Sequence, residues 1–379
     1  ALIYVHIPFC RSFCSYCNFY SSTKTREIPG VLESIALEWK KDRDLWLDIF
    51  RSAEPDAGHT LYFGGGTPTV CAAGELCALI TLLREDMEQA GLTLAELTVE
   101  ANPGDLTPEY CHVLLDAGVN RLSIGVQSFH DPYLEAMRRR HNGRQAANSA
   151  ILARKAGFAN ISLDLIFGFP GLTAEKWKDT LGQAIALGPE HISAYQLSLE
   201  PSSLWGKTGV LPPQEECALQ YALLQETLQG AGYLQYEVSS FCLPGKESLH
   251  NSGYWIRRPY AGLGPSAHSF NGKDRYANVA DLRKYTEGIR RNEPARKYDR
   301  LTARDVHNEW VMLSLRTSKG LSLQEMEERK GRPATKDFLK QITPLLERGL
   351  LIRTGNKVSI PANRLFVSDD IIRDCLLPG

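Results

Sequence analysis

The sequence predicts an α/β fold, a partial (β/α)6 parallel barrel followed by a smaller C-terminal winged-helix-like α+β domain. Short apolar, β-rich segments recur in the first half at intervals of mostly about 30 to 40 residues, the length of one βα unit, and a helical pattern follows each of them. Their near-continuous apolar character is typical of parallel strands covered on both faces. Six such units favour a barrel over a two-sided open sheet, although the pattern alone does not separate the two.

The expected elements follow in chain order. The six strands cover residues 2–9, 60–66, 97–102, 121–129, 161–168 and 192–199. The helices between them cover residues 29–51, 74–90, 108–117, 131–137, 145–156 and 174–187. A helix over 214–230 and a strand over 232–241 come next. After residue 295, a helix over 305–315, two short helices and a hairpin turning at Thr354-Gly355-Asn356 predict the winged-helix-like domain.

Composition excludes several classes of protein. The chain has 379 residues, a net charge of -1 and 43% apolar residues, which permits sizeable cores and gives no global attraction to nucleic acid or anionic lipid. Nine cysteines over this length do not form a disulfide framework. No apolar run reaches the roughly 18 residues of a membrane span, and no signal peptide is visible at the start. We therefore expect a cytoplasmic protein.

Three cysteines stand in one short loop after the first strand. Cys10, Cys14 and Cys17 have the spacing C-x3-C-x2-C. Three thiolates can hold three irons of a [4Fe–4S] cluster and leave the fourth iron open to a small molecule. A structural zinc site would need four ligands, usually as two spaced pairs, and a disulfide would leave one cysteine over. The loop therefore predicts an iron–sulfur site.

Polar residues gather at the carboxyl ends of the other predicted strands, where parallel α/β folds place their chemistry. Strand two ends in the glycine-rich run 64–69, which lacks the lysine of a P-loop and could otherwise be a tight turn. Glu100, Gln127 and Asp164 lie at or near three further strand ends. Each could be a structural polar residue, but together they suggest a ribose or amino-acid ligand. Arg139 is either part of a solvated run of charged residues or the partner of a ligand carboxylate.

A second motif is His250-Asn251-Ser252-Gly253-Tyr254-Trp255. Imidazole is a common axial ligand of haem iron, and aromatic rings stack on a porphyrin. A packed structural histidine is the alternative for His250, as it is for His268. The C-terminal domain could bind DNA, but its positive charge is spread along the sequence and no basic recognition helix is visible. We expect instead a lid or a substrate-holding module.

These residues resemble the oxygen-independent coproporphyrinogen III oxidase family of radical S-adenosylmethionine (SAM) proteins. The resemblance runs over nearly the whole chain, from the segment Tyr4-Val-His-Ile-Pro-Phe-Cys10 onward. Within that family it is strongest to the HemW-type haem chaperones. Phe19 stands where the oxidases have a fourth cysteine, and residues 250–255 match the H-N-x-x-Y-W signature associated with haem binding.

The resemblance implies a radical SAM partial barrel over 1–210, a barrel extension with a haem-binding segment over 211–295, and a C-terminal domain over 296–379. It implies that Cys10, Cys14 and Cys17 ligate a [4Fe–4S] cluster and that His250 binds haem. The residues it assigns to SAM are Tyr4, Tyr16, Gly65, Gly66, Thr67, Glu100, Gln127, Arg139 and Asp164. The implied partners are haem, acceptor haemoproteins of respiration, and an electron donor if SAM is cleaved.

The implied function is a haem chaperone that carries the cluster, SAM and haem and delivers haem to respiratory haemoproteins. Phe19 argues against coproporphyrinogen oxidase activity. The open alternatives are that oxidase, a radical SAM enzyme that modifies haem, and a zinc protein or winged-helix regulator. Peripheral contact with the inner membrane face and oligomerisation also stay open, whereas no nucleic-acid partner is expected.

Overall fold

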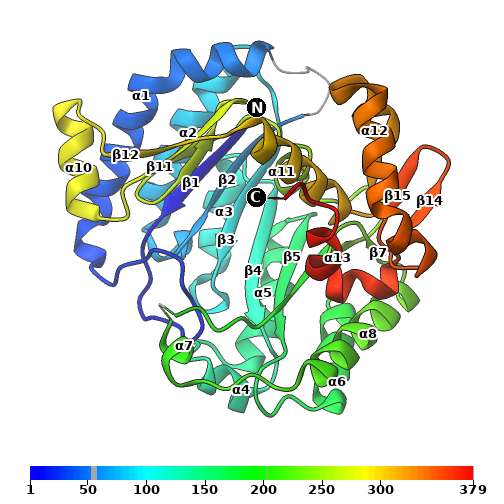
Figure 1. Cartoon of the computed structure of the whole chain (residues 1–379). Coiled ribbons are helices and arrows are strands. Elements are labelled where there is room, and N and C mark those ends of the chain that lie inside the picture. Colours follow the sequence, from blue (N-terminus) through cyan, green and yellow to red (C-terminus); the bar gives the residue numbers. More distant parts are fainter. Residues whose placement is uncertain (53–57, 202, 379) are drawn as a thin grey trace.

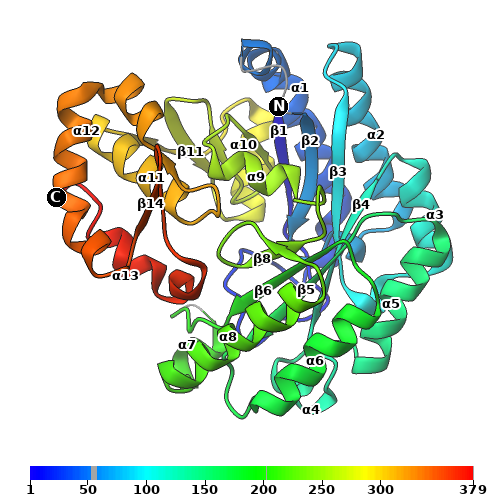
Figure 2. The same cartoon turned by 90° about the vertical axis from the view of Figure 1, so that its right-hand side faces the viewer.

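A computed structural model describes residues 1–52, 58–201 and 203–378. Its main body is a curved nine-stranded sheet with the order β7-β8-β6-β5-β4-β3-β2-β1-β9 (Figures 1 and 2). Neighbours from β1 to β6 are all parallel, and β9 adds to β1 in parallel. The predicted α/β fold with a curved, mainly parallel sheet is confirmed.

The six predicted strands are all present, with ends that differ by a few residues. They are β1 (Leu2–Ile7), β2 (His59–Gly65), β3 (Leu94–Ala101), β4 (Arg121–Gln127), β5 (Ile161–Phe167) and β6 (His191–Gln196). The helices that cover their outer face are α1 (Ile28–Ser52), α2 (Ala73–Gln89), α3 (Pro108–Asp116), α4 (Asp131–Ala136), α5 (Gly143–Ala156) and α6 (Ala174–Ala186). Short 3₁₀ helices are η1 (Thr25–Glu27), η3 (Pro68–Val70) and η4 (Pro103–Asp105).

The region after β6 is less regular than expected. Helices α7 (Leu204–Thr208) and α8 (Gln214–Gly230) lead into two short strands, β7 (Leu234–Gln235) and β8 (Ser240–Cys242), rather than the single strand predicted over 232–241. Both run antiparallel to their neighbours at the far edge of the sheet. The chain then returns through α9 (Leu249–Trp255) to β9 (Ala261–Leu263) at the opposite edge. No regular spacing of apolar residues in the sequence indicates this return of the chain to the opposite edge of the sheet.

Two small antiparallel sheets complete the molecule. The first contains β10 (His268–Phe270), β11 (Asp274–Asn278) and β12 (Arg296–Arg300), with α10 (Leu282–Arg291) inserted between the last two strands. The second belongs to the C-terminal domain, which consists of α11 (Ala303–Leu315), β13 (Leu321–Ser322), α12 (Leu323–Glu347), β14 (Ile352–Thr354), β15 (Lys357–Ser359), η5 (Ala362–Val367) and α13 (Ser368–Arg373). Gly331 interrupts α12, so the two predicted short helices are both present. Figure 2 shows α11, α12 and α13 grouped to one side of the barrel.

Side chains alternate along the central strands, apolar toward the helices and polar toward the interior. On β3, Leu97 and Val99 belong to the apolar core, whereas Thr98 and Glu100 face the other side. The buried polar side chains of neighbouring strands include Thr60, Arg121, Ser123, Ser162, His191 and Ser193. The barrel interior is therefore suited to polar ligands. Within the described residues, no helix is both long and apolar enough to cross a membrane.

One buried carboxylate ties the first helix to the late segments of the chain. Glu38 of α1 is 1% exposed and accepts hydrogen bonds from Gly264 N (2.9 Å), Asn278 Nδ2 (2.7 Å) and Tyr285 OH (2.6 Å). Arg296 Nη2 lies 3.2 Å from Glu38 Oε1 and also pairs with a second α1 carboxylate. Since these partners come from the β9–β10 turn, β11, α10 and β12, this cluster fixes the small sheet against the barrel.

We predict that Glu38→Ala lowers the free energy of unfolding by about 3–5 kcal/mol, because three donors lose their shared buried acceptor and Arg296 keeps only one of its two carboxylate partners. Denaturant unfolding followed by circular dichroism measures this. Glu33→Ala on the same helix is the matched control, since Glu33 is exposed and pairs only with exposed Arg290. The control should change stability by less than about 1 kcal/mol. Equal effects of the two variants would contradict the assignment.

Candidate functional site

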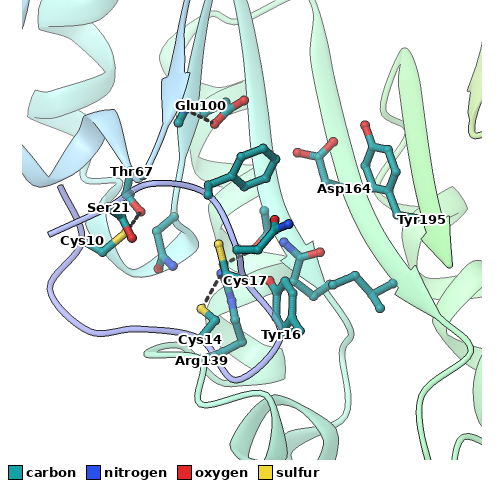
Figure 3. Close-up of a pocket in the computed structure, with 18 of the residues that line it drawn as sticks. Cys10, Cys14, Tyr16, Cys17, Ser21, Thr67, Glu100, Arg139, Asp164 and Tyr195 are labelled. Carbon is teal, nitrogen blue, oxygen red and sulfur yellow. Dashed lines mark hydrogen bonds between the residues drawn. The ribbon is translucent and has the colours of Figure 1, made fainter. Parts of the chain in front are cut away.

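A cavity of about 950 Å³ opens at the carboxyl ends of the parallel strands. The cysteine loop, the glycine run after β2 and the polar side chains of β3 to β6 all line it (Figure 3). Its volume lies near the upper end of the range for small-molecule sites. The features predicted separately from the sequence therefore meet in one place.

The cysteine loop is irregular but anchored at its centre. Ser15 is 1% exposed, donates from its backbone N to Met137 O (3.1 Å), and donates from Oγ to Ala136 O (3.0 Å). Its carbonyl accepts from Trp205 N (2.8 Å). The loop is thus held between the end of α4 and the start of α7, while the cysteines on both sides of Ser15 face the cavity.

The three thiols lie in surroundings that fit an iron–sulfur cluster. Arg139 Nη1 donates to Cys14 Sγ at 3.5 Å, and Cys10 Sγ lies 3.7 Å from Thr67 Oγ1. Burial raises the pKa of Cys10, and it raises the pKa of Cys17 to about 11. Three soft ligands and a neighbouring cation match a thiolate-bound anionic cluster. Among the residues that the structure describes, no three His, Cys, Asp or Glu side chains stand close enough together to form a metal site.

Glycine is needed where β2 meets this loop. Gly66 N donates to Ile7 O at 2.9 Å, and a Cβ at Gly66 would lie 2.6 Å from Phe9 O. Gly65 has φ +108°, and its Cβ would lie 2.4 Å from His6 Nδ1. No side chain fits at either position without displacing its neighbours, so the glycines allow the backbone of β2 to approach the start of the cysteine loop.

Two carboxyl groups face the interior from β3 and β5, the strands on either side of β4. Glu100 accepts from Tyr62 OH (2.8 Å) and from Gly65 N (3.2 Å), and Asp164 accepts from Ser123 Oγ (3.0 Å). Burial raises the pKa of Glu100 to about 7 and that of Asp164 to about 6. Both groups can therefore exchange a proton near neutrality, and both are placed to bind the hydroxyl or amine groups of a polar ligand.

Gln127 owes its position to an irregularity in β4. The pairing of β4 with β5 shifts between Gly125 and Gln127. Gln127 has a φ of +65°, a backbone conformation that residues other than glycine rarely adopt. The strained residue lines the cavity. Arg139 Nη2 donates to Gly125 O at 2.6 Å next to this bulge. Such strain at a cavity wall is typical of a ligand site.

Eight of the nine residues expected to contact SAM line this cavity, and Tyr4 does not. Tyr4 OH lies 3.0 Å from His6 Nδ1, and its ring packs against Tyr62 at 6.1 Å between centroids. It supports the cavity wall from behind. The eight that line the cavity are Tyr16, Gly65, Gly66, Thr67, Glu100, Gln127, Arg139 and Asp164.

Tyr62 and Arg121 are two of several lining residues that the sequence analysis did not assign to the site. Tyr62 bonds Glu100, and Arg121 sends a guanidinium that is 1% exposed into the interior, where no described residue hydrogen-bonds its Nε. The charge of Arg121 lowers the pKa of both Glu100 and Asp164, opposing the effect of burial. The position of Arg121 at the start of a largely apolar strand was the sequence feature that could have identified it as a site residue.

His250 lies beneath the cavity surface rather than on it. It is 1% exposed, its Nδ1 lies 2.7 Å from Thr60 Oγ1, and its Nε2 lies 2.8 Å from Tyr254 OH. Its ring stacks on Tyr62 at 4.9 Å, and burial lowers the pKa of His250 to about 3. Binding of haem iron by either ring nitrogen would require one of these hydrogen bonds to break. Its neighbour Asn251 does line the cavity.

The comparisons with known proteins agree with this arrangement. Residues 4–184 match the radical SAM superfamily, and residues 301–363 match the HemN C-terminal domain. The chain is 35% identical over 363 residues to heme chaperone HemW of Bacillus subtilis (strain 168), covering 94% of this chain and 93% of that protein. It belongs to the HemW family of radical SAM proteins.

Other similarities support the same family. Heme chaperone HemW of Escherichia coli (strain K12) is 36% identical over 267 residues, covering 70% of this chain and 69% of that protein. Coproporphyrinogen III oxidase (HemN) from E. coli, described as a radical SAM enzyme, has a solved structure that matches with a TM-score of 0.83 and 23% identity, covering 99% and 89% of the two chains. The latter similarity establishes the fold. Membership of the radical SAM family implies a [4Fe–4S] cluster and SAM.

We predict that Cys14→Ser abolishes most of the iron and sulfide taken up during anaerobic reconstitution, because two thiolates cannot retain the cluster. Cys77→Ser is the control, since Cys77 is buried outside the loop and its thiol donates only to Val113 O. Iron and acid-labile sulfide per chain measure the outcome. An undiminished cluster in Cys14→Ser would contradict the ligand assignment.

A second prediction concerns pH. The pKa of Glu100 is about 7 in the folded chain and near 4.5 when unfolded, so its stabilising contribution is complete below pH 4.5 and is lost as pH rises through 7. Stability of the wild type relative to Glu100→Gln should therefore fall by about 1–3 kcal/mol between pH 5 and 8. Denaturant unfolding at several pH values measures it, with exposed Glu33→Gln as control. If the difference in free energy of unfolding between the wild type and Glu100→Gln did not vary with pH, the raised pKa of Glu100 would be contradicted.

Proposed function

We propose that this chain is a haem chaperone that carries a [4Fe–4S] cluster and SAM, binds haem, and transfers it to haemoproteins of respiration. The observation that carries the proposal is the 35% identity to a heme chaperone over nearly the whole chain. The cavity supports it, because a thiol loop, a polar interior and exposed aromatic side chains meet there.

In this proposal Cys10, Cys14 and Cys17 hold the cluster, and the eight lining residues named above bind SAM. The bulge at Gln127 and the Glu100 carboxylate orient the polar parts of SAM, and Arg139 balances the charge of the thiolates. A cluster held by these cysteines would, once reduced, supply an electron for cleavage of SAM. The protein contributes orientation and exclusion of water.

Coproporphyrinogen oxidase activity is the second candidate, favoured by the fold shared with HemN. Phe19 opposes it, because it takes the position of the fourth cysteine in the oxidase pattern. It lines the cavity with 66% of its surface exposed. A ring there offers an apolar surface in place of a thiol.

We predict that cluster-loaded protein binds haem saturably, and that SAM with dithionite leaves the amount of haem unchanged. Anaerobic absorption spectroscopy follows binding, and addition of a haem-free respiratory haemoprotein then tests transfer. The control is the same titration with SAM alone. Haem loss only when SAM and reductant are both present would instead indicate a haem-modifying enzyme. Decarboxylation of coproporphyrinogen III in the presence of SAM and dithionite would instead favour the coproporphyrinogen oxidase function.

A further inference from the structure

The mouth of the cavity carries an unusual amount of exposed apolar surface. Phe13 is 54% exposed and Phe19 is 66% exposed, and among the described residues no other phenylalanine is exposed. Both belong to the cysteine loop. Tyr195 (45%) and Leu204 (41%) line the same cavity. We call Phe13, Phe19 and Leu204 the apolar rim, whereas the ring of Tyr195 lies beside Asp164 (Figure 3). Grouped exposed rings at a cavity mouth mark a surface that binds something.

Charges beside the apolar rim restrict what that ligand can be. Exposed Arg138 and Lys207 line the same cavity, whereas Arg140 is already paired with Asp105 through two hydrogen bonds of 3.0 and 2.8 Å. The acidic residue Glu200 also lines the cavity, and it accepts a hydrogen bond from Ser198 Oγ. Flat apolar rings bordered by two cations suit a planar aromatic ligand that carries carboxylates. Haem, with its apolar macrocycle and two propionates, has this chemistry.

The alternative site at His250 is closed. Both nitrogens of its ring are hydrogen-bonded, and the helix it belongs to is fixed by Glu96, which accepts from Leu249 N (2.8 Å) and His250 N (3.0 Å). Glu96 is itself 3% exposed. A ligand reaches the apolar rim without disturbing any of these bonds, whereas it reaches His250 only if α9 unpacks.

Resting on the proposed function, we infer that haem binds at the cavity mouth, its macrocycle stacked on Phe13 and Phe19 and its propionates turned toward Arg138 and Lys207. His250 is then a positioning residue that holds Tyr62 and α9 rather than an iron ligand. Because the apolar rim contacts the ring and not the metal, binding does not depend on iron. A site without a strong axial bond also suits a protein that must release its haem.

The test compares haem with metal-free protoporphyrin IX, titrated into cluster-loaded protein under anaerobic conditions. We expect dissociation constants that agree within about threefold for the wild type, because stacking and charge pairing act on both ligands alike. Phe13→Ser/Phe19→Ser should weaken both by at least about tenfold, the usual cost of losing buried aromatic contacts. Phe19→Tyr should retain binding, because the ring remains.

Tyr298→Ser is the matched control, since Tyr298 is 64% exposed and lies in β12, away from the cavity. Iron and sulfide are measured in every variant, so that cluster loss is not read as loss of haem binding. Three results together would overturn this site and leave the chaperone function standing. The wild type would bind haem but not metal-free protoporphyrin, the double serine variant would bind haem as tightly as the wild type, and His250→Ala would lose haem binding. Binding of neither ligand by the wild type would instead remove the chaperone function itself.

Discussion

The hydrogen bonds of the Glu100 carboxylate hold the cavity together. One oxygen accepts from Tyr62 OH and the other from Gly65 N, so β2 and β3 are joined at their carboxyl ends beside the glycine run. Tyr62 in turn stacks on His250, and the helix of His250 is capped by Glu96 from the same strand as Glu100. The polar interior of the cavity and the H-N-x-x-Y-W motif are therefore linked by a continuous chain of contacts.

The cavity has two chemically different parts, an interior and a mouth. The interior presents carboxyl, hydroxyl and guanidinium groups, which suit a small polar cofactor, and burial brings the pKa of two of its carboxyl groups close to neutrality. The mouth presents aromatic rings and cations. The cysteine loop lies between the two and contributes to both, through its thiols and through Phe13 and Phe19. Such a division suits the proposed function, with SAM in the interior and haem at the mouth.

The sequence predicted the six parallel strands and most helices because each has a local apolar pattern. It also predicted that the cysteines, Glu100, Gln127 and Asp164 would face one site, because parallel strands end at a common edge. It could not predict the bulge that turns Gln127, or the burial of His250, because both depend on partners far away in the chain. The same holds for Glu38, whose partners lie more than 200 residues later. Tyr62 and Arg121 were missed because each looked like part of an ordinary strand.

The central claim of the proposed function is that Cys10, Cys14 and Cys17 would hold a [4Fe–4S] cluster beside the cavity and that the cavity would take SAM. Electron paramagnetic resonance of the reduced, reconstituted protein tests it most directly, recorded with and without SAM. We predict that SAM changes the spectrum of a [4Fe–4S] cluster in the wild type and that the change weakens in Glu100→Gln. A fully loaded cluster whose spectrum is the same at saturating SAM would contradict the account.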